Sequence, residues 1–146
     1  MLIGILQSNA FRARARSGDS LRIYLPGMIP LADPPSYIAS SDLEMVLIQD
    51  ICLSYRLSLP NKLFEYLHAG LPVTCSDLPE MARVVREYQV GELTDPEDPA
   101  SIAHCIQSIL GDPVRYTQMK ANARKATENF NWQIESTKLI ALYTTL

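Results

Sequence analysis

The stretch from Tyr55 to Asp77, which reads YRLSLPNKLFEYLHAGLPVTCSD, constrains the fold more than any other part of the sequence. Pro60 is tolerated in the first turn of a helix, because the N–H that proline lacks would be unpaired there anyway. Ser58 or Asn61 can cap that helix start through a side-chain oxygen. The apolar side chains after it have helical spacing and predict one apolar stripe, formed by Leu63, Phe64 and Leu67.

The same stretch predicts the end of the helix and a strand after it. Gly70 lies where a left-handed residue commonly closes a helix, and Pro72 prevents the helix from continuing. The residues from Val73 to Cys75 then read as a short buried strand. A helix followed by such a strand places the helix N-terminus at the edge of a parallel sheet, where unpaired N–H groups bind anions. Glu65 is the single acid of this helix; as a plain surface carboxylate it would gain only about 0.3–1 kcal/mol from the helix dipole.

Strands and helices alternate along the chain. We expect strands at 2–6, 21–25, 43–48, 73–75 and 90–93, a loop at 49–59, and helices at 10–17, 36–40, 79–87, 99–110, 114–127 and 132–146 besides the one near Pro60. This order predicts an α/β protein with a Rossmann-like parallel sheet and helices on both faces. Ligands of such sheets bind at the carboxyl ends of the strands. Arg56, in the loop after 43–48, is therefore a candidate phosphate partner, with a plain surface arginine as the alternative.

Composition and charge exclude several classes of function. The 146 residues form one domain, 1–146, and the net charge of −3 leaves no basic footprint for nucleic acid. No apolar run reaches the roughly 18 residues of a membrane helix. Cys52, Cys75 and Cys105 are scattered and read as small buried hydrophobes of a reducing, cytoplasmic compartment. His68 and His104 lack neighbours that could share a metal, so we expect no metal site and no cofactor.

The segment PNKLFEYLHAGLPVTCSD resembles the donor site of retaining glycosyltransferases of the GT-B fold, of the family 4 or group 1 type. The resemblance extends through SDLEMVLI, GELTDPEDPASIA and FNWQIESTKLIALY, and is specific over 61–77. It implies the C-terminal, donor-binding half of the GT-B fold. It also implies transfer of a hexosyl group from a nucleotide sugar in polysaccharide or glycoconjugate synthesis. Peripheral association with the inner face of the membrane is compatible with this role.

The resemblance also assigns residues to the donor site. A glutamate at the Glu65 position accepts hydrogen bonds from both ribose hydroxyls of the nucleotide sugar. Backbone groups of Gly27, Met28 and Ile29 pass under the base. The helix start contributes Leu59, Pro60, Asn61 and Lys62, with Arg56 as a phosphate partner. No metal is implied, and the catalytic residues stay unassigned.

The chain departs from the family pattern in ways that open an alternative. Many members carry a second glutamate where this chain has Leu57, and neither a diphosphate-binding loop nor an acceptor-binding domain is recognisable. We therefore expect an incomplete N-terminal side, no transfer activity by the chain alone and a separate acceptor domain as partner. The alternative is a non-catalytic relative that binds a nucleotide or a partner protein. An unpaired sheet edge or an uncovered last helix also predicts a homodimer.

Overall fold

The computed structural model describes residues 38–144. They belong to the second of two compact units, Met1–Tyr37 and Ile38–Leu146. The strands expected at 2–6 and 21–25, the helix at 10–17 and the candidate site residues Gly27, Met28 and Ile29 lie outside the described residues.

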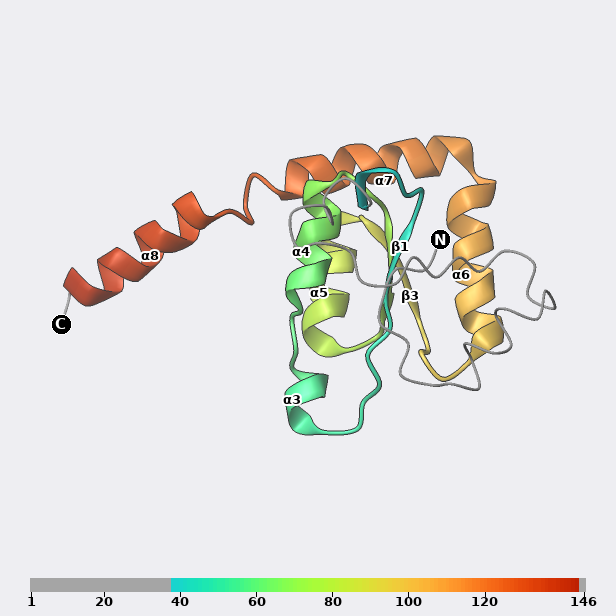
Figure 1. Ribbon diagram of the computed structural model, residues 1–146, viewed down its shortest axis with the longest axis horizontal. Coiled ribbons are helices and arrows are strands. Elements are labelled where there is room, and N and C mark those ends of the chain that lie inside the picture. Colours follow the sequence, from blue (N-terminus) through green and yellow to red (C-terminus); the bar gives the residue numbers. More distant parts are fainter. Residues whose placement is uncertain (1–37, 145–146) are drawn as a thin grey trace. The chain divides into compact units, whose positions relative to one another are not determined.

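The described part alternates strands and helices as the sequence predicts (Figure 1). Its elements are β1 (Glu44–Val46), α3 (Leu53–Arg56), α4 (Asn61–His68), β2 (Val73–Ser76), α5 (Pro79–Tyr88), β3 (Gly91–Thr94), α6 (Pro99–Gly111), α7 (Pro113–Ala126) and α8 (Trp132–Thr144).

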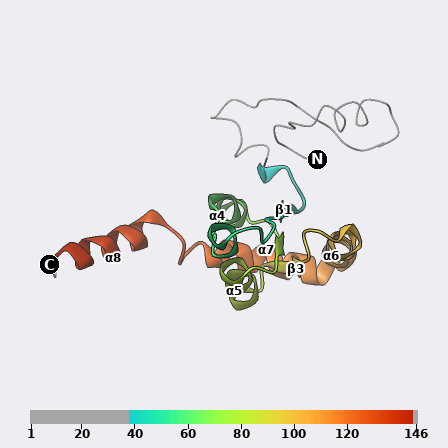
Figure 2. The same ribbon diagram turned by 90° about the horizontal axis from the view of Figure 1, so that it is seen from below.

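The three described strands form one parallel sheet in the order β1-β2-β3. Glu44 pairs with Val73, and Val73 pairs in turn with Gly91. Parallel neighbours need a crossover, and helices supply each one: α3 and α4 join β1 to β2, and α5 joins β2 to β3. Seen along the sheet, α4 and α5 lie on one side of the strands and α6 on the other (Figure 2).

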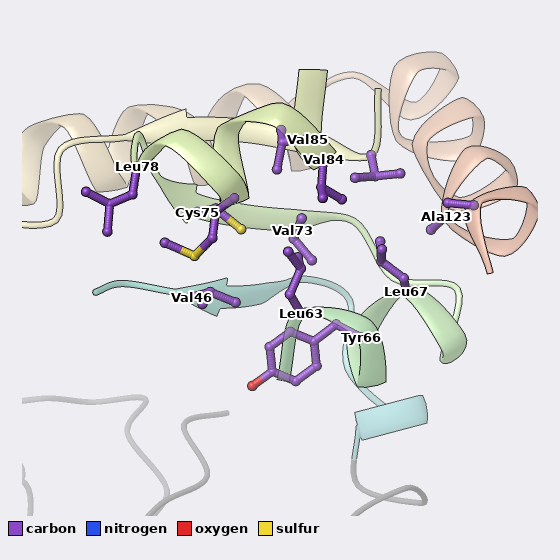
Figure 3. Close-up of a cluster of buried hydrophobic side chains, with 13 residues drawn as sticks. Val46, Leu63, Tyr66, Leu67, Val73, Cys75, Leu78, Val84, Val85 and Ala123 are labelled. Atoms are coloured by element: carbon purple, nitrogen blue, oxygen red, sulfur yellow. The ribbon is translucent and has the colours of Figure 1, made fainter. Parts of the chain in front are cut away.

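The apolar core fills the face of the sheet that α4, α5 and α7 cover (Figure 3). Val73 and Cys75 of β2 are fully buried there, with Leu63 and Leu67 of α4 packed against them. Full burial of one such aliphatic side chain contributes about 1.5–3 kcal/mol. The inward residues expected on the next helix, Met81, Val84 and Val85, are buried as predicted.

The opposite face of the sheet is polar, because alternate strand residues point to opposite sides. Thr74, Ser76 and Thr94 are all buried. The Thr94 hydroxyl is hydrogen-bonded to the Ser101 hydroxyl of α6 at 2.8 Å, and the Ser76 hydroxyl accepts from the Ile48 N–H at 2.8 Å. Within the described chain, the Thr74 hydroxyl has no hydrogen-bond partner. Helices therefore cover both faces, as expected, but the two faces differ in chemistry.

Backbone capping explains where several helices start and stop. Gly70 has φ +70°, and it closes α4 as predicted, with its N–H bonded to the Leu67 carbonyl. The carboxylates of Asp98 and Asp112 accept hydrogen bonds from N–H groups at the starts of α6 and α7. Asn131 accepts from the Ile134 N–H at 3.0 Å, so the cap expected for the last helix is confirmed.

One element was not expected. The prediction of a continuous loop over 49–59 is wrong, because Leu53–Arg56 form the one-turn helix α3. This helix buries none of its residues, so no apolar stripe in the sequence marks it. It is held by local backbone bonds, such as the one from the Leu57 N–H to the Leu53 carbonyl at 3.0 Å.

Candidate functional site

The candidate site lies at the edge of the sheet where the strands end. The strands are parallel, so the carboxyl ends of β1, β2 and β3 share one edge. Helix α4 connects the end of β1 to the start of β2, and it therefore begins at that same edge. Figure 1 shows α3 and the start of α4 at one end of the sheet. Open α/β sheets bind ligands at this edge.

The start of α4 is built differently from the prediction. Pro60 is the N-cap residue, with extended backbone (φ −72°, ψ 143°), rather than a first-turn residue, and no side chain caps the helix. The cap expected from Ser58 or Asn61 is wrong on both counts. Ser58 donates to the Tyr55 carbonyl at 2.8 Å and closes α3, whereas Asn61 is already inside α4.

This arrangement leaves donors at the helix start. Leu63 N–H is bonded to the Pro60 carbonyl at 3.0 Å. Within residues 38–144, the N–H groups of Asn61 and Lys62 make no hydrogen bond. Two backbone donors that precede the first intrahelical bond are what an anion at a helix N-terminus would contact.

Glu65 lies one turn inside α4, with its side chain exposed. Its neighbours Leu63, Tyr66 and Leu67 form the buried side of the helix. In the described part of the chain, the Glu65 carboxylate has neither a hydrogen bond nor an ion pair. This carboxylate is therefore available to donors from a ligand.

Two further ionisable groups lie close to Glu65 or to Lys62, namely Tyr66 and Glu44. Burial raises the pKa of Tyr66 to about 12, with smaller contributions from the Glu44 and Glu65 carboxylates. Burial likewise raises the pKa of Glu44, which a Ser41 hydrogen bond and the Lys62 charge partly offset. Helix α4 therefore carries a protonated phenol, Tyr66, that interacts with the Glu65 carboxylate, and its Lys62 interacts with the half-buried Glu44 carboxyl group of β1.

The predicted site residues do not all face one way. Leu59 and Asn61 line a groove of about 1,140 Å³ on another side of α4, together with Phe64, Tyr88 and Phe130. Phe130 lies 5.1 Å from the Phe64 ring and 5.0 Å from the Tyr88 ring, measured between centroids. Lys62 and Glu65 do not line this groove. The helix start thus separates the predicted set into two groups.

The loop before α4 carries the remaining candidates. Arg56 pairs with Asp50 at 3.7 Å, and both side chains are largely exposed, so the pair adds little to stability. Leu57, the residue that replaces the second family glutamate, is 53% exposed. Its side chain offers no hydrogen-bond acceptor to a ligand.

A polar cavity at the same edge was not predicted from the sequence. It has a volume of about 430 Å³ and is lined by residues at or after the strand ends and by the start of α6, including Asp50, Ser76, Asp77, Thr94, Asp95 and Ser101. A signal for it is present, since polar residues stand at or just after each expected strand end. The loop from Asp95 to Asp98 indicates the start of the helix expected at 99–110. The Asp98 carboxylate, which accepts a hydrogen bond from the Ala100 N–H, confirms that helix start.

The described chain offers neither a metal cluster nor a membrane span. Within residues 38–144, no group of three or more His, Cys, Asp or Glu side chains could hold a metal ion. In the same part of the chain, no helix is long and apolar enough to span a membrane. Cys75 and Cys105 are buried as expected, but the prediction of a buried Cys52 is wrong, because that residue is exposed.

Comparison with known proteins places the chain among sugar transferases. Residues 1–112 match the family described as "Glycosyl transferases group 1". The chain is 30% identical over 84 residues to phosphatidyl-myo-inositol mannosyltransferase of Mycobacterium leprae, an alignment that covers 58% of this chain and 22% of that protein. It is 31% identical over 74 residues to D-inositol 3-phosphate glycosyltransferase 1 of Catenulispora acidiphila, covering 51% and 18%. The matched segments thus span about a fifth of these relatives.

A solved structure confirms the fold prediction. Sucrose-phosphate synthase from Thermosynechococcus elongatus superposes with a TM-score of 0.76 at 24% identity, covering 99% of this chain and 37% of that chain. The open parallel sheet with helices on both faces is therefore a Rossmann-like domain of the GT-B type. Since the family match covers more than half of the residues, this chain belongs to the group 1 glycosyl transferases.

Proposed function

We propose that this chain binds the nucleotide-sugar donor of a hexosyl transfer, in polysaccharide or glycoconjugate synthesis. The observation that carries the proposal is the Glu65 carboxylate, exposed and without a hydrogen bond or ion pair in the described chain, one turn inside a helix without a side-chain cap. The membership of the family supports it. So do relatives whose names describe a mannosyltransferase and inositol glycosyltransferases.

In this proposal, Glu65 accepts hydrogen bonds from the ribose. An ionised carboxylate is acceptor-only, and its two oxygens suit the two adjacent hydroxyls of a ribose. Hydrogen bonds to a charged group contribute about 1.5–3 kcal/mol. The absence of a competing cation on Glu65 within residues 38–144 means that no ion pair there has to break before ribose binds.

The start of α4 would meet the charged part of the donor. The backbone N–H groups of Asn61 and Lys62 would donate to it, next to Leu59 and Pro60, and the Lys62 ammonium would approach from the other side of α4. Arg56 reaches the same site only by exchanging its exposed partner Asp50 for phosphate. Gly27, Met28 and Ile29 stay part of the proposal as the contacts to the base.

In the transfer itself, the bond between the sugar C1 and the diphosphate oxygen breaks, and a bond from C1 to an acceptor hydroxyl forms as that hydroxyl loses its proton. The nucleotide diphosphate leaves with the electron pair. We propose that a separate domain holds the acceptor and that no metal is needed. The three free cysteines support a reducing, cytoplasmic setting.

Calorimetric titration with a panel of nucleotide sugars tests the donor proposal. We expect Glu65→Ala to weaken binding about tenfold or more. Glu128→Ala is the matched control, because Glu128 is also an exposed glutamate, in the turn just after α7, and makes no side-chain ion pair within the described chain. Equal affinities for the two variants would contradict the assignment of Glu65.

Leu57 favours a second candidate function, that of a non-catalytic module. Its exposed side chain stands where many family members place a carboxylate next to the transferred sugar. A module of this kind would bind the nucleotide and leave the sugar in place. The two functions separate in one experiment, in which binding is measured by calorimetry and release of the nucleotide diphosphate is followed in the same sample.

A further inference from the structure

Tyr66 of α4 combines a buried ring with a hydroxyl that the described fold does not use. The residue is 9% exposed and belongs to the core cluster, together with Leu63 and Leu67. Within residues 38–144, its hydroxyl makes no hydrogen bond. A buried tyrosine usually finds a partner for its O–H group. This hydroxyl is therefore left for water or for a ligand.

The Tyr66 hydroxyl reaches the surface although its ring does not. In the described chain, the Thr74 hydroxyl is the only polar side-chain group that is both enclosed and without a hydrogen bond. The unbonded Tyr66 hydroxyl is therefore not enclosed. Side chains of a helix lean toward its N-terminus, and Figure 3 shows the Tyr66 ring turned back along α4 toward Leu63. The hydroxyl thus points along α4 toward its first turn, where the candidate donor site begins.

Glu65, Lys62 and Tyr66 share one side of α4. At 3.6 residues per turn they fall within an arc of about 100°, with Lys62 between the other two. This side differs from the one that carries Asn61, because none of the three lines the groove that Asn61 lines. The carboxylates of Glu44 and Glu65 both act on the Tyr66 phenol electrostatically. The free acceptor of Glu65 and the free donor of Tyr66 therefore lie close to each other.

The charges around the phenol indicate which kind of ligand group it would bind. Two carboxylates act on it, so charge repulsion disfavours a phosphate oxygen next to the Tyr66 hydroxyl. A neutral hydroxyl avoids this repulsion, since it can accept from a phenol and donate to a carboxylate at the same time. Burial raises the pKa of Tyr66 to about 12, so the phenol remains a donor at neutral pH. A sugar hydroxyl is thus the ligand group that matches Glu65 and Tyr66 together.

We propose that Tyr66 contacts the ribose that Glu65 binds and makes the site selective for ribonucleotides over deoxyribonucleotides. This inference rests on the proposed donor function and adds a second ribose contact to it. One ribose hydroxyl donates a hydrogen bond to the Glu65 carboxylate and accepts one from the Tyr66 phenol. A nucleotide without that hydroxyl leaves both protein groups unpaired. A site built to bind a hydroxyl rejects an analogue that lacks it.

Calorimetric titration tests the inference with the diphosphates of uridine, guanosine, adenosine and cytidine, each beside its 2′-deoxy and 3′-deoxy counterparts. For the ribonucleotide that binds most tightly, Tyr66→Phe should weaken binding about threefold to tenfold, the effect of one neutral hydrogen bond. For the deoxy analogue that lacks the contacted hydroxyl, wild type and variant should bind equally. Tyr143→Phe is the control, because it removes the hydroxyl of an exposed tyrosine on α8 and should change neither affinity.

Three results would overturn the assignment of Tyr66. They are a wild-type chain that does not prefer the ribonucleotide, a Tyr66→Phe variant that binds it as tightly as wild type, and an equal loss for the ribonucleotide and both deoxy analogues. Phenylalanine keeps the buried ring, and the hydroxyl has no bond in the described chain, so thermal unfolding of Tyr66→Phe should match that of wild type.

Glu65→Ala distinguishes failure of this inference from failure of the donor function. If Glu65→Ala weakens nucleotide binding and Tyr66→Phe does not, the Tyr66 contact alone is wrong. If no nucleotide binds, or if neither variant changes the affinity, the donor function is wrong and the Tyr66 contact is wrong with it.

Discussion

Gly70 shows how one residue fixes the end of the site helix. Its backbone has φ +70°, and the N–H groups of Gly70 and Leu71 bond to the carbonyls of Leu67 and Tyr66, respectively. Those two bonds satisfy the last carbonyls of α4 and turn the chain into β2. This helix end was predictable from the sequence. Glycine suits the left-handed closing residue, and the proline two residues later cannot continue the helix.

We expect Gly70→Ala to lower the free energy of unfolding by about 1–2 kcal/mol, the cost of a left-handed conformation for a residue with a side chain. The new Cβ would also lie 2.7 Å from Arg124 Nε, although that flexible side chain can move. Urea denaturation measures the change. Gly111→Ala is the control, since nothing lies within 4 Å of its Cβ position, and it should be neutral or slightly stabilising.

The cysteines should differ in reactivity, because the thiolate is the nucleophile. Burial raises the pKa of Cys75 to about 12 and also raises that of Cys105, whereas Cys52 is exposed. Mass spectrometry after alkylation at mildly alkaline pH should show one rapid label, at Cys52, with the other two labelled only in urea. Rapid labelling of Cys75 in the folded chain would show that the Cys75 side chain on β2 is not buried as described.

The raised pKa of Cys75 makes the stability of the folded state depend on pH. The Cys75 thiol keeps its proton in the folded state up to about pH 12, whereas the ordinary thiol pKa is 9.0. The folded state therefore binds this proton more tightly, and its contribution to stability is lost as the pH rises from about 9 towards 12. Cys75→Ser should flatten that alkaline decline in thermal unfolding experiments, and Cys52→Ser should not.

At the scale of elements, a partly buried hydrogen-bond network connects three of them. The Glu92 carboxylate of β3 accepts a hydrogen bond from the Ser108 hydroxyl of α6 at 2.7 Å and pairs with Arg115 of α7. The Glu92 side chain is 15% exposed, and Arg115 also donates to Ser108 at 3.0 Å. This network anchors α6 on the polar face of the sheet, where few apolar contacts are available.

Removal of the Glu92 side chain should therefore lower the free energy of unfolding more than removal of an exposed acidic side chain. We expect Glu92→Ala to lower the free energy of unfolding by about 1–2 kcal/mol, below the full value for a charged hydrogen bond because Arg115 is 45% exposed. Glu80→Ala removes an exposed pair with Arg83 and should change it by less than about 0.5 kcal/mol. Chemical denaturation of the two variants gives the comparison.

The order of helices and strands was largely predictable from the sequence. The features that could not be predicted have physical reasons. The strand expected at 73–75 is Val73–Ser76, and the helix expected at 79–87 is Pro79–Tyr88, because each has a regular apolar pattern. Helix α3 has no buried face and so leaves no such pattern. The role of Pro60 as N-cap could not be read either, since Pro60 fits both positions and only the backbone geometry decides.

At the scale of the whole molecule, the matched segments span about a fifth of the curated relatives. The candidate donor site lies within residues 1–112, which match the family. The place of Glu65 one turn inside a helix was predictable from its motif, and its role in donor binding stays a prediction. The two different sides of α4 that carry Glu65 and Asn61 were not predictable, because helix orientation depends on packing against β2. The polar cavity beyond the strand ends depends on residues far apart in sequence for the same reason.

We predict that this chain alone binds a nucleotide sugar but transfers no sugar. The reason is that the exposed Leu57 side chain offers no hydrogen-bond acceptor at the position where many family members carry a glutamate. A radiolabelled nucleotide sugar with a panel of acceptors should give no sustained product, while binding persists. Product formation at many turnovers would contradict the prediction, and addition of the acceptor domain of a relative provides the positive control.

We further predict that donor binding needs no metal ion. Titrations with EDTA and with added magnesium or manganese should give the same affinity. A loss of affinity in EDTA that either metal restores would contradict this expectation and would place a cation between the diphosphate and the exposed carboxylates.

The order of the strands has a consequence for how the chain is made. Because the described sheet runs β1-β2-β3, each strand joins the edge left by the one synthesised just before it. Long-range parallel pairing is a slow step in the folding of a domain. Here each crossover helix leaves the ribosome before the strand it delivers, so pairing never has to wait for a distant segment. The site helix α4 therefore leaves the ribosome before β3, α6 and α7, and its packing is completed when Ala123 and Ala126 of α7 join the core.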